Sequence, residues 1–350
     1  MREINPGAVN GRPTLADVAR EAGVSLKTAS RVVNNERYVR TVLREQVAGA
    51  VQKLGYRSND LARHLVLQTT RTIGLVIADI SNPFYGACAL GVMRVARRHG
   101  YTVVLNASDE GVHAERDYVA LLVQQRVAGL LLVPAPGDHT YLTTEISRGL
   151  RIVALDRPLQ GLENDCAIVE NEPGAFAATD HLIQHGRRRI AFLGGSESIF
   201  TYAMRLEGYR RAMAAAGAAE MINLVNPTVE GALADTRRLL TGRHRPDAIL
   251  CVNNRVTVGA LTALVQMGVT IPDELALVGF DDFELADVFH PPLTMVRQPA
   301  IALGMNAATL LIDRIEGRET GAPRTIVLPV ELMIRDSCGS HDDFRSPGAA

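Results

Sequence analysis

Short apolar runs alternate with amphipathic segments from about residue 73 onward, and this alternation constrains the fold more than any other feature of the chain. A first array contains the strand candidates "TIGLVIADI", "YTVVLNAS", "VAGLLLVPA" and "LRIVALDR", with helices predicted near 86–99 and 114–125. A second array contains "RRIAFLGG", "DAILCVNN" and "ALVGFDD", with helices predicted near 173–185, 204–216, 233–241 and 256–267. Such alternation is typical of parallel sheets covered by helices. We therefore predict an α/β body of two parallel-sheet subdomains, with a ligand site in the cleft between them.

The first 60 residues follow a different, all-helical pattern. Thr14 and Asp17 form a capping-box pattern before a first helix, which Gly23 ends, and Ser25 is placed to cap a second helix. Apolar residues between 43 and 54 then predict a third helix that closes the core. Three short helices with a tight glycine turn between the first two indicate a helix-turn-helix domain.

The stretch "GVSLKTASRVVN", residues 23–34, contains the second of these helices. Ala29, Val32 and Val33 form its apolar stripe, whereas Lys27 and Arg31 lie on other faces. The second helix of a helix-turn-helix domain is the one that enters the major groove of DNA. We therefore interpret its polar face as a surface that reads DNA.

The charge distribution supports a nucleic-acid partner for the head of the chain alone. Residues 1–72 contain 12 Lys or Arg and 6 Asp or Glu, although the whole chain has a net charge of −1. The remainder is therefore acidic. A basic head on an acidic body is expected to bind double-stranded DNA through the head.

Several classes of protein are disfavoured by the sequence. The first residues lack the apolar segment of a signal peptide, and runs such as "GLLLVPAPG" are too short to span a bilayer, so we expect a cytoplasmic protein without a membrane partner. The four cysteines are far apart and are expected to be reduced and buried. His181 and His185 are spaced like a metal pair but lack an evident third ligand, and no nucleophile, carboxylate pair or phosphate loop indicates an enzyme. We expect no metal and no cofactor.

Seven motifs in register resemble the lac repressor (LacI/GalR) family. They are "TLADVAREAGVSLKTASRVVN", "LGYRSNDLARHL", "RTIGLVIADISNPFY", "RLEGYRRAM", "PDAILCVNN", "LVGFDD" and "PPLTMVRQP". The resemblance implies a homodimeric repressor with a periplasmic-binding-protein-like body, which binds a pseudo-palindromic operator and responds to a sugar or sugar derivative. It also implies a helix-turn-helix domain at 12–57, a hinge helix and linker at 58–72, and a tail at 339–350. The first subdomain is expected at 73–168 plus 298–325, and the second at 169–297 plus 326–338.

The resemblance also implies which residues contact DNA and effector. The residues expected at the DNA are Thr14, Ser25, Leu26, Lys27, Thr28, Ser30, Arg31, Asn34, Tyr38, Asn59, Ala62 and Leu65. Lys27 and Arg31 can donate hydrogen bonds to guanine, and Leu65 is expected to wedge into the minor groove. The residues expected at the effector are Asn82, Phe84, Asp156, Arg205, Asn253 and Asp281.

Some alternatives stay open at this point. Phe84 could equally be a core residue, and Arg157, Tyr85 and Asn171 could serve either ligand or structure. The run Val66-Leu67-Gln68 departs from the basic residue and glycine common in the family, so coupling between hinge and body need not copy other members. The body alone would also suit a solute-binding protein for transport, but the basic head and the lack of a signal peptide disfavour that function. Both an inducer and a co-repressor are compatible with the cleft.

Overall fold

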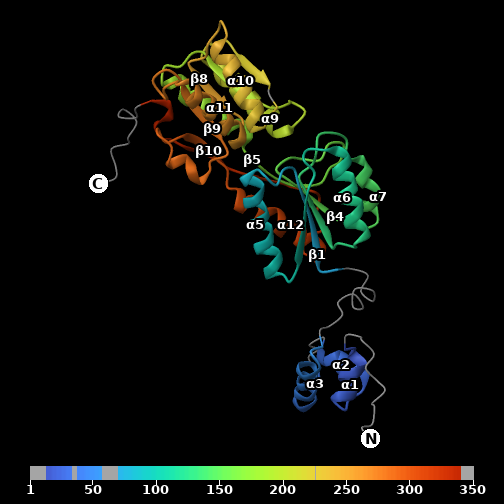
Figure 1. Cartoon of the computed structure of the whole chain (residues 1–350). Helices are drawn as coiled ribbons and strands as arrows, with labels where there is room; N and C mark the ends of the chain where they lie inside the picture. The colour runs from blue at the N-terminus through green and yellow to red at the C-terminus, as the bar shows by residue number, and fades with distance from the viewer. Residues whose placement is uncertain (1–12, 34–37, 57–69, 225, 340–350) are drawn as a thin grey trace, which may run out of the picture. The chain divides into compact units, whose positions relative to one another are not determined.

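The computed structural model describes residues 13–33, 38–56, 70–224 and 226–339 (Figure 1). The chain divides between Thr69 and Thr70 into two compact units. The first unit is a small helical domain and the second is the α/β body. Each has its own hydrophobic core.

The helical domain contains α1 (Leu15–Glu21), α2 (Leu26–Val33) and α3 (Thr41–Leu54). The predicted capping box is present, because the Asp17 amide donates to Thr14 Oγ1 and the Thr14 amide donates to the Asp17 carboxylate. Gly23 has a φ of 64° and ends the first helix, and the Thr28 amide donates to Ser25 Oγ at the start of the second. The local signals in the sequence thus position both helices of the motif.

The core of this domain consists of small and β-branched side chains from all three helices. Val18, Ala29 and Val47 are fully buried, and Ala19 and Ala50 are nearly so. One buried residue of α2, Ala29, faces this core while the rest of the helix stays partly or fully exposed. Val32 and Val33 also pack against the core, so the exposed surface of the helix is the face that carries Leu26, Lys27 and Arg31.

The first sheet of the body is entirely parallel. Its strands are β1 (Thr72–Ile77), β2 (Thr102–Ala107), β3 (Gly129–Leu132), β4 (Arg151–Leu155), β5 (Asp165–Val169) and β11 (Thr325–Leu328), in the order β11-β5-β4-β3-β1-β2. The helices α5 (Pro83–Arg98) and α12 (Ala300–Ile315) cover one face, and α6 (Val112–Gln124) and α7 (Thr143–Ser147) cover the other (Figure 1). A short 3-10 turn, η1 (Thr140–Leu142), precedes α7.

Alternate residues of its central strands enter two different cores. Leu131 packs with α5 and α12, while Leu130 and Leu132 pack beneath α6. Because successive side chains of a strand point to opposite faces, a strand covered on both sides must be apolar throughout. This explains why β3 is a continuous apolar run rather than an alternating one.

The second sheet repeats this arrangement. Its strands are β6 (Ile190–Gly194), β7 (Met221–Leu224), β8 (Ala248–Cys251), β9 (Ala276–Phe280), β10 (Thr294–Arg297) and β12 (Glu331–Met333), in the order β12-β10-β9-β8-β6-β7. Only β12 is antiparallel to its neighbour. The helices are α8 (Asn171–Gln184), α9 (Phe200–Ala215), α10 (Val229–Thr241) and α11 (Asn254–Met267), and the 3-10 turns are η2 (Glu284–Asp287) and η3 (Asp336–Cys338). The predicted body of two parallel-sheet subdomains is confirmed.

The chain passes between the subdomains at three places, and strand pairing corrects three of the expected boundaries. Residues 326–328 were expected in the second subdomain, but β11 pairs with β5 and therefore belongs to the first sheet through Leu328. Val169 likewise ends β5 in the first sheet. Thr72, expected in the linker, already pairs with Thr102. In each case the hydrogen bonds between neighbouring strands extend beyond the boundary that the sequence predicted.

Two further expectations concern membrane-spanning helices and the four cysteines. None of the described helices is long and apolar enough to cross a membrane. Cys88, Cys166, Cys251 and Cys338 are free thiols and are all buried, as expected from their spacing. Burial raises the pKa of Cys251 to about 12, so this thiol stays protonated at neutral pH.

Candidate functional site

The exposed face of α2 carries two cationic side chains one helical turn apart. Lys27 and Arg31 are both exposed, and Leu26 beside them has 54% of its surface exposed. Residues four apart on a helix lie on the same face, so these two cations can contact one partner together. No acidic residue lies in the first turn of α2. This face can therefore donate to base edges or phosphates.

The remaining residues expected at the DNA fall into three groups. The hydroxyls of Thr14 and Ser25 are engaged as helix caps, and Ser25 Oγ lies 2.9 Å from Thr28 Oγ1. Ser30 is half-buried, whereas Tyr38 has 90% of its surface exposed. The others lie outside the described residues: Asn34, Asn59, Ala62 and Leu65. The same holds for the run from Val66 to Gln68.

Two buried carboxyl groups and one buried guanidinium group meet in the body, between its two subdomains. Asp156 follows β4 of the first sheet, and Asp281 follows β9 of the second. Arg205 of α9 places Nη1 3.6 Å from Asp281 Oδ1. Burial raises the pKa of Asp281, Arg205 opposes this shift, and the charge of Asp156 adds to it.

Arg205 is held in place by its own subdomain. Its Nε donates to Asn171 Oδ1 (2.8 Å), its Nη1 donates to the carbonyl oxygen of Val252 (2.6 Å), and its guanidinium lies 3.7 Å from the centre of the Phe280 ring. A guanidinium fixed on several sides is preorganised for a ligand hydroxyl. Asn171, which the sequence left undecided, therefore positions Arg205.

Asparagine side chains connect the two subdomains directly. Asn82 caps α5 by accepting from the Phe84 amide, and it also accepts from Asn254 Nδ2 of α11 at 3.2 Å. Beside this contact, Arg255 Nη1 donates to Asp79 Oδ2 (2.5 Å) and to Ser81 Oγ (2.7 Å). The cleft is therefore closed at this point by contacts within the protein.

Asn253 has two roles at the cleft. It caps α11 by accepting from the Val256 amide at 2.8 Å, and its Nδ2 donates to Tyr202 Oη at 3.0 Å. Tyr202 lies on α9, three residues before Arg205, so both side chains lie on one face of that helix. Burial raises the pKa of Tyr202 to about 12, so its hydroxyl stays protonated.

Arg157 is the centre of a network that belongs to the first subdomain. Its Nη1 and Nη2 donate to the two carboxylate oxygens of Glu110, each at 2.8 Å. Its Nη2 also donates to Tyr85 Oη at 2.8 Å, and its Nε donates to Asp156 Oδ2 at 3.3 Å. Although burial lowers the pKa of Arg157, Tyr85 and Glu110 raise it, and the net change is upward. The guanidinium group therefore stays charged.

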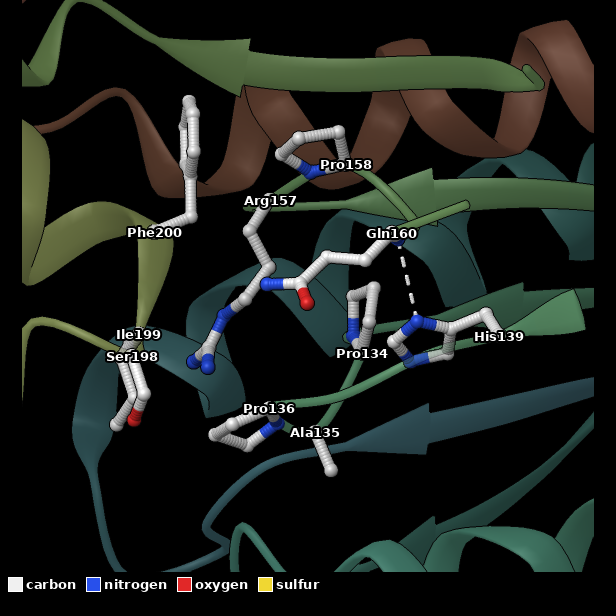
Figure 2. A pocket seen from close by; sticks show the side chains of 10 residues that line it. All are labelled: Pro134, Ala135, Pro136, His139, Arg157, Pro158, Gln160, Ser198, Ile199 and Phe200. Carbon is white, nitrogen blue, oxygen red and sulfur yellow. Dashed lines mark hydrogen bonds between the residues drawn. The ribbon is translucent and has the colours of Figure 1, made fainter. Parts of the chain in front are cut away.

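Arg157 borders a small cavity between the subdomains, and Figure 2 shows its side chain extending toward Ser198 and Ile199 at the start of α9. The opposite wall contains His139, whose Nδ1 accepts from the Gln160 amide at 3.2 Å. On its other side His139 Nε2 lies 3.4 Å from the buried carboxylate of Glu115. Both subdomains thus contribute to the lining of this cavity.

A second cavity of about 740 Å³ borders the same region and is lined by Phe84, Asn254, Asp281 and Gln298, among others. Gln298 Nε2 donates to Asp281 Oδ1. Phe84 has 7% of its surface exposed and also belongs to the core beneath α5. The ring therefore serves both as core and as cavity wall, and its contact with an effector stays a prediction.

The structure thus brings together Asp156, Arg205 and Asp281, and it places Asn82 and Asn253 at the helix starts around them. Sequence reasoning missed Glu110, Tyr202 and Gln298. The sequence could have indicated Tyr202, because it lies three residues before Arg205, a spacing that places two side chains on one face of a helix. Glu110 had none, because its contact with Arg157 joins residues 47 positions apart.

His181 and His185 contact each other edge to face, with ring centres 4.5 Å apart. In the part of the chain that the structure describes, no group of three or more His, Cys, Asp or Glu side chains is placed to hold a metal ion. The site is therefore built from hydrogen-bonding groups and apolar surface.

Comparison with known protein families gives two matches. Residues 14–59 match the model of bacterial regulatory proteins of the lacI family, and residues 179–338 match a periplasmic binding protein-like domain. The first match covers the three-helix domain, and the second covers most of the second subdomain and two of the three crossings.

Individual proteins match over nearly the whole chain. The HTH-type transcriptional repressor PurR of Photobacterium profundum is 33% identical over 328 residues, which cover 93% of this chain and 98% of that protein. The solved complex of the transcriptional regulator CelR with cellobiose is 33% identical, covering 93% of this chain and 100% of the other, with a TM-score of 0.71. The lac repressor dimer bound to operator and the anti-inducer ONPF is 27% identical, covering 94% and 100%, with a TM-score of 0.84.

Proposed function

The chain belongs to the LacI family of bacterial transcriptional regulators, and from this premise we propose that it is a repressor that binds a pseudo-palindromic operator as a homodimer and senses a sugar or sugar derivative in its cleft. The relatives described above are regulators and repressors rather than enzymes. A protein with this function acts at the DNA, in the cytoplasm.

The DNA-binding part of the proposal rests on α2. Lys27 in the first turn and Arg31 in the last turn are exposed on one face of the helix that enters the major groove in this motif. Bidentate contacts from such side chains to guanine discriminate between bases by about 1–3 kcal/mol each. The exposed Tyr38 ring, which follows α2 in the sequence, would add surface for contact with the DNA.

The effector part rests on one observation, the convergence of Asp156 from the first subdomain with Arg205 and Asp281 from the second. Carboxyl and guanidinium groups can together bind the neighbouring hydroxyls of a sugar. A ligand that contacts groups from both subdomains favours one closure of the cleft. It shifts DNA binding only by its difference in affinity between the two body states. The cellobiose complex of a relative with 33% identity supports a sugar as the ligand class.

The homodimer is supported by exposed apolar residues on the body. Leu90 and Met93 lie one turn apart on α5, with 43% and 42% of their surface exposed. Leu285 and Val288 of the η2 region are 59% and 64% exposed. Burial of such side chains is the main driving force of association, and a two-fold operator needs two helix-turn-helix domains. Light scattering is expected to show a dimer at micromolar concentration, and a stable monomer would contradict this.

The whole proposal is tested by a mobility-shift assay on the DNA upstream of the gene that encodes the protein, with and without a panel of sugars. We expect a specific complex whose amount changes with one class of sugar. An inducer releases the complex and a co-repressor strengthens it. A complex that forms equally on unrelated DNA, or that no sugar alters, would contradict the repressor or the sugar effector respectively.

A further inference from the structure

The guanidinium groups at the cleft are all engaged by carboxyl groups of the protein. Within the described residues, the pairs are Arg157 with Glu110, Arg205 with Asp281, Arg255 with Asp79, and Arg297 of the larger cavity with Asp282. The side chains of Arg157 and Arg205 are almost completely buried. The remaining charged groups beside the small cavity, Glu115 and His139, contact each other. Each of these described cations therefore already has a carboxylate partner within the protein.

The pair of Arg157 and Glu110 has the geometry that an anionic ligand would otherwise adopt. Two parallel hydrogen bonds of 2.8 Å join the guanidinium to the Glu110 carboxylate. Arginine binds phosphate and carboxylate groups through the same two-pronged geometry. Glu110 therefore occupies the edge of Arg157 that a ligand phosphate would use, and Tyr85 and Asp156 occupy further donors.

The backbone around Glu110 is shaped for this contact. Asp109 and Glu110 have φ values of 50° and 59°, so two consecutive non-glycine residues adopt the left-handed conformation. Such residues are uncommon, and they persist where the surrounding structure determines them. The turn directs Glu110 to Arg157 across 47 residues of sequence. The side chain of Glu110 is 30% exposed, whereas that of Arg157 is 5% exposed.

We propose that Glu110 is a specificity-determining residue, which neutralises Arg157 so that the cleft accepts uncharged sugars and rejects those that carry a phosphate or carboxylate. This inference rests on the proposed function and narrows its ligand class. Three carboxyl groups, Glu110, Asp156 and Asp281, face two guanidinium groups, Arg157 and Arg205. An anionic ligand would add charge to a site that already has more carboxyl groups than cations, and it would have to displace Glu110.

The test measures binding of inorganic phosphate to the full chain by ³¹P NMR line broadening. Glu110→Gln keeps the size of the side chain but removes its charge, so Arg157 becomes available. We expect this variant to bind phosphate at least tenfold more tightly than the wild type. Asp109→Asn is the matched control, because it removes the same charge from the same turn at an exposed side chain. It is expected to behave like the wild type.

The double variant Glu110→Gln/Arg157→Gln assigns the effect, because phosphate sites elsewhere on the chain are common to all variants. It is expected to lose the gained binding. The proposal is overturned if Glu110→Gln binds phosphate no better than the wild type, if Asp109→Asn shows the same gain, or if the gain persists without Arg157. Glu110→Ala repeats the test with a second side chain should Glu110→Gln fail to fold, as judged by thermal unfolding. Because phosphate is the probe, the result does not depend on whether any sugar alters operator binding, which is the separate test of the proposed function.

Discussion

Asp156 and Asp281 occupy equivalent positions in the two subdomains. Each follows the third strand from one edge of its sheet, β4 or β9, and each has a left-handed backbone, with φ of 73° and 69°. Aspartate tolerates this conformation better than most side chains, and strained positions of this kind cluster at functional sites. The repeated sheet architecture therefore presents one buried carboxyl group from each half of the body to the same cleft.

Asp281→Asn is expected to stabilise the protein at neutral pH. Burial raises the pKa of Asp281 above its unfolded value of 3.8, so the charged form is disfavoured in the folded state. For a raised carboxyl pKa, the stabilising contribution is complete below pH 3.8 and is lost as the pH rises through the folded value. The variant should therefore unfold at a higher temperature than wild type at pH 7, and the difference should shrink as the pH falls toward 4. A wild type that is more stable at pH 7 would show that Arg205 outweighs burial.

Arg205→Ala is expected to remove the response to the effector, because the proposed ligand site includes this guanidinium beside Asp281. Coupling between sites is typically ~1–3 kcal/mol. With an inducer, the variant should bind operator about as well as wild type and ignore the sugar. With a co-repressor, it should bind operator weakly in both conditions. Calorimetry with the effector checks the site, and Arg210→Ala on the same helix, where the side chain is more exposed, is the control. Undiminished affinity of Arg205→Ala for the effector would place the ligand elsewhere.

Arg31→Ala is expected to weaken operator binding by about 1–3 kcal/mol, with the fold intact, because the side chain is exposed. Lys27→Ala should mainly relax base preference. Arg20→Ala removes the same charge from α1, where Asp17 already neutralises it at 3.1 Å, and serves as the control with a smaller effect. Fluorescence anisotropy with operator and scrambled DNA measures both quantities. Equal operator affinity of Arg31→Ala and wild type would contradict the assignment of α2.

Arg255→Ala and Asp79→Asn are each expected to weaken closure of the cleft. The pair joins the subdomains at 2.5 Å, and the side chains are 27% and 25% exposed, so the contribution should be below about 1 kcal/mol. Each substitution should lower effector affinity up to about fivefold, measured by calorimetry. The double variant should lose no more than either single variant, because both remove one interaction. Fully additive losses would mean that the two residues act separately.

Gly91→Ala is expected to destabilise the body by about 1–3 kcal/mol through overpacking. A Cβ at this position would lie 2.1 Å from the carbonyl oxygen of Ile301, where α5 meets α12. Gly86→Ala on the same helix is the control, since no heavy atom lies within 4 Å of its added Cβ. It should stabilise the helix by about 0.5–1 kcal/mol. Thermal unfolding distinguishes the two, and a neutral Gly91→Ala would show that the helices can move apart.

Much of the fold could be predicted because its signals are local. The caps at Thr14 and Ser25, the turn at Gly23 and the apolar strands each depend on a few neighbouring residues. The helix α12 was not anticipated, although its buried residues Leu303, Gly304, Ala307, Ala308 and Leu311 recur at helical spacing. The strands β5, β7, β10, β11 and β12 were not anticipated, because each is short and has few residues in which a pattern could show.

The sequence by itself determined the two kinds of domain, the second helix of the helix-turn-helix domain and the carboxylates that follow β4 and β9. Periodicity, caps and motifs each depend on residues that are close together in the sequence. Only the tertiary structure decided which groups each of these side chains contacts. Asn82 meets Asn254 across 172 residues, and Glu110 meets Arg157 across 47. Such contacts depend on how two sheets face each other, and their free energy comes from burial and charge pairing that exist only once the chain has folded. The contacts that line the cleft are therefore set by the fold as a whole rather than by any one motif.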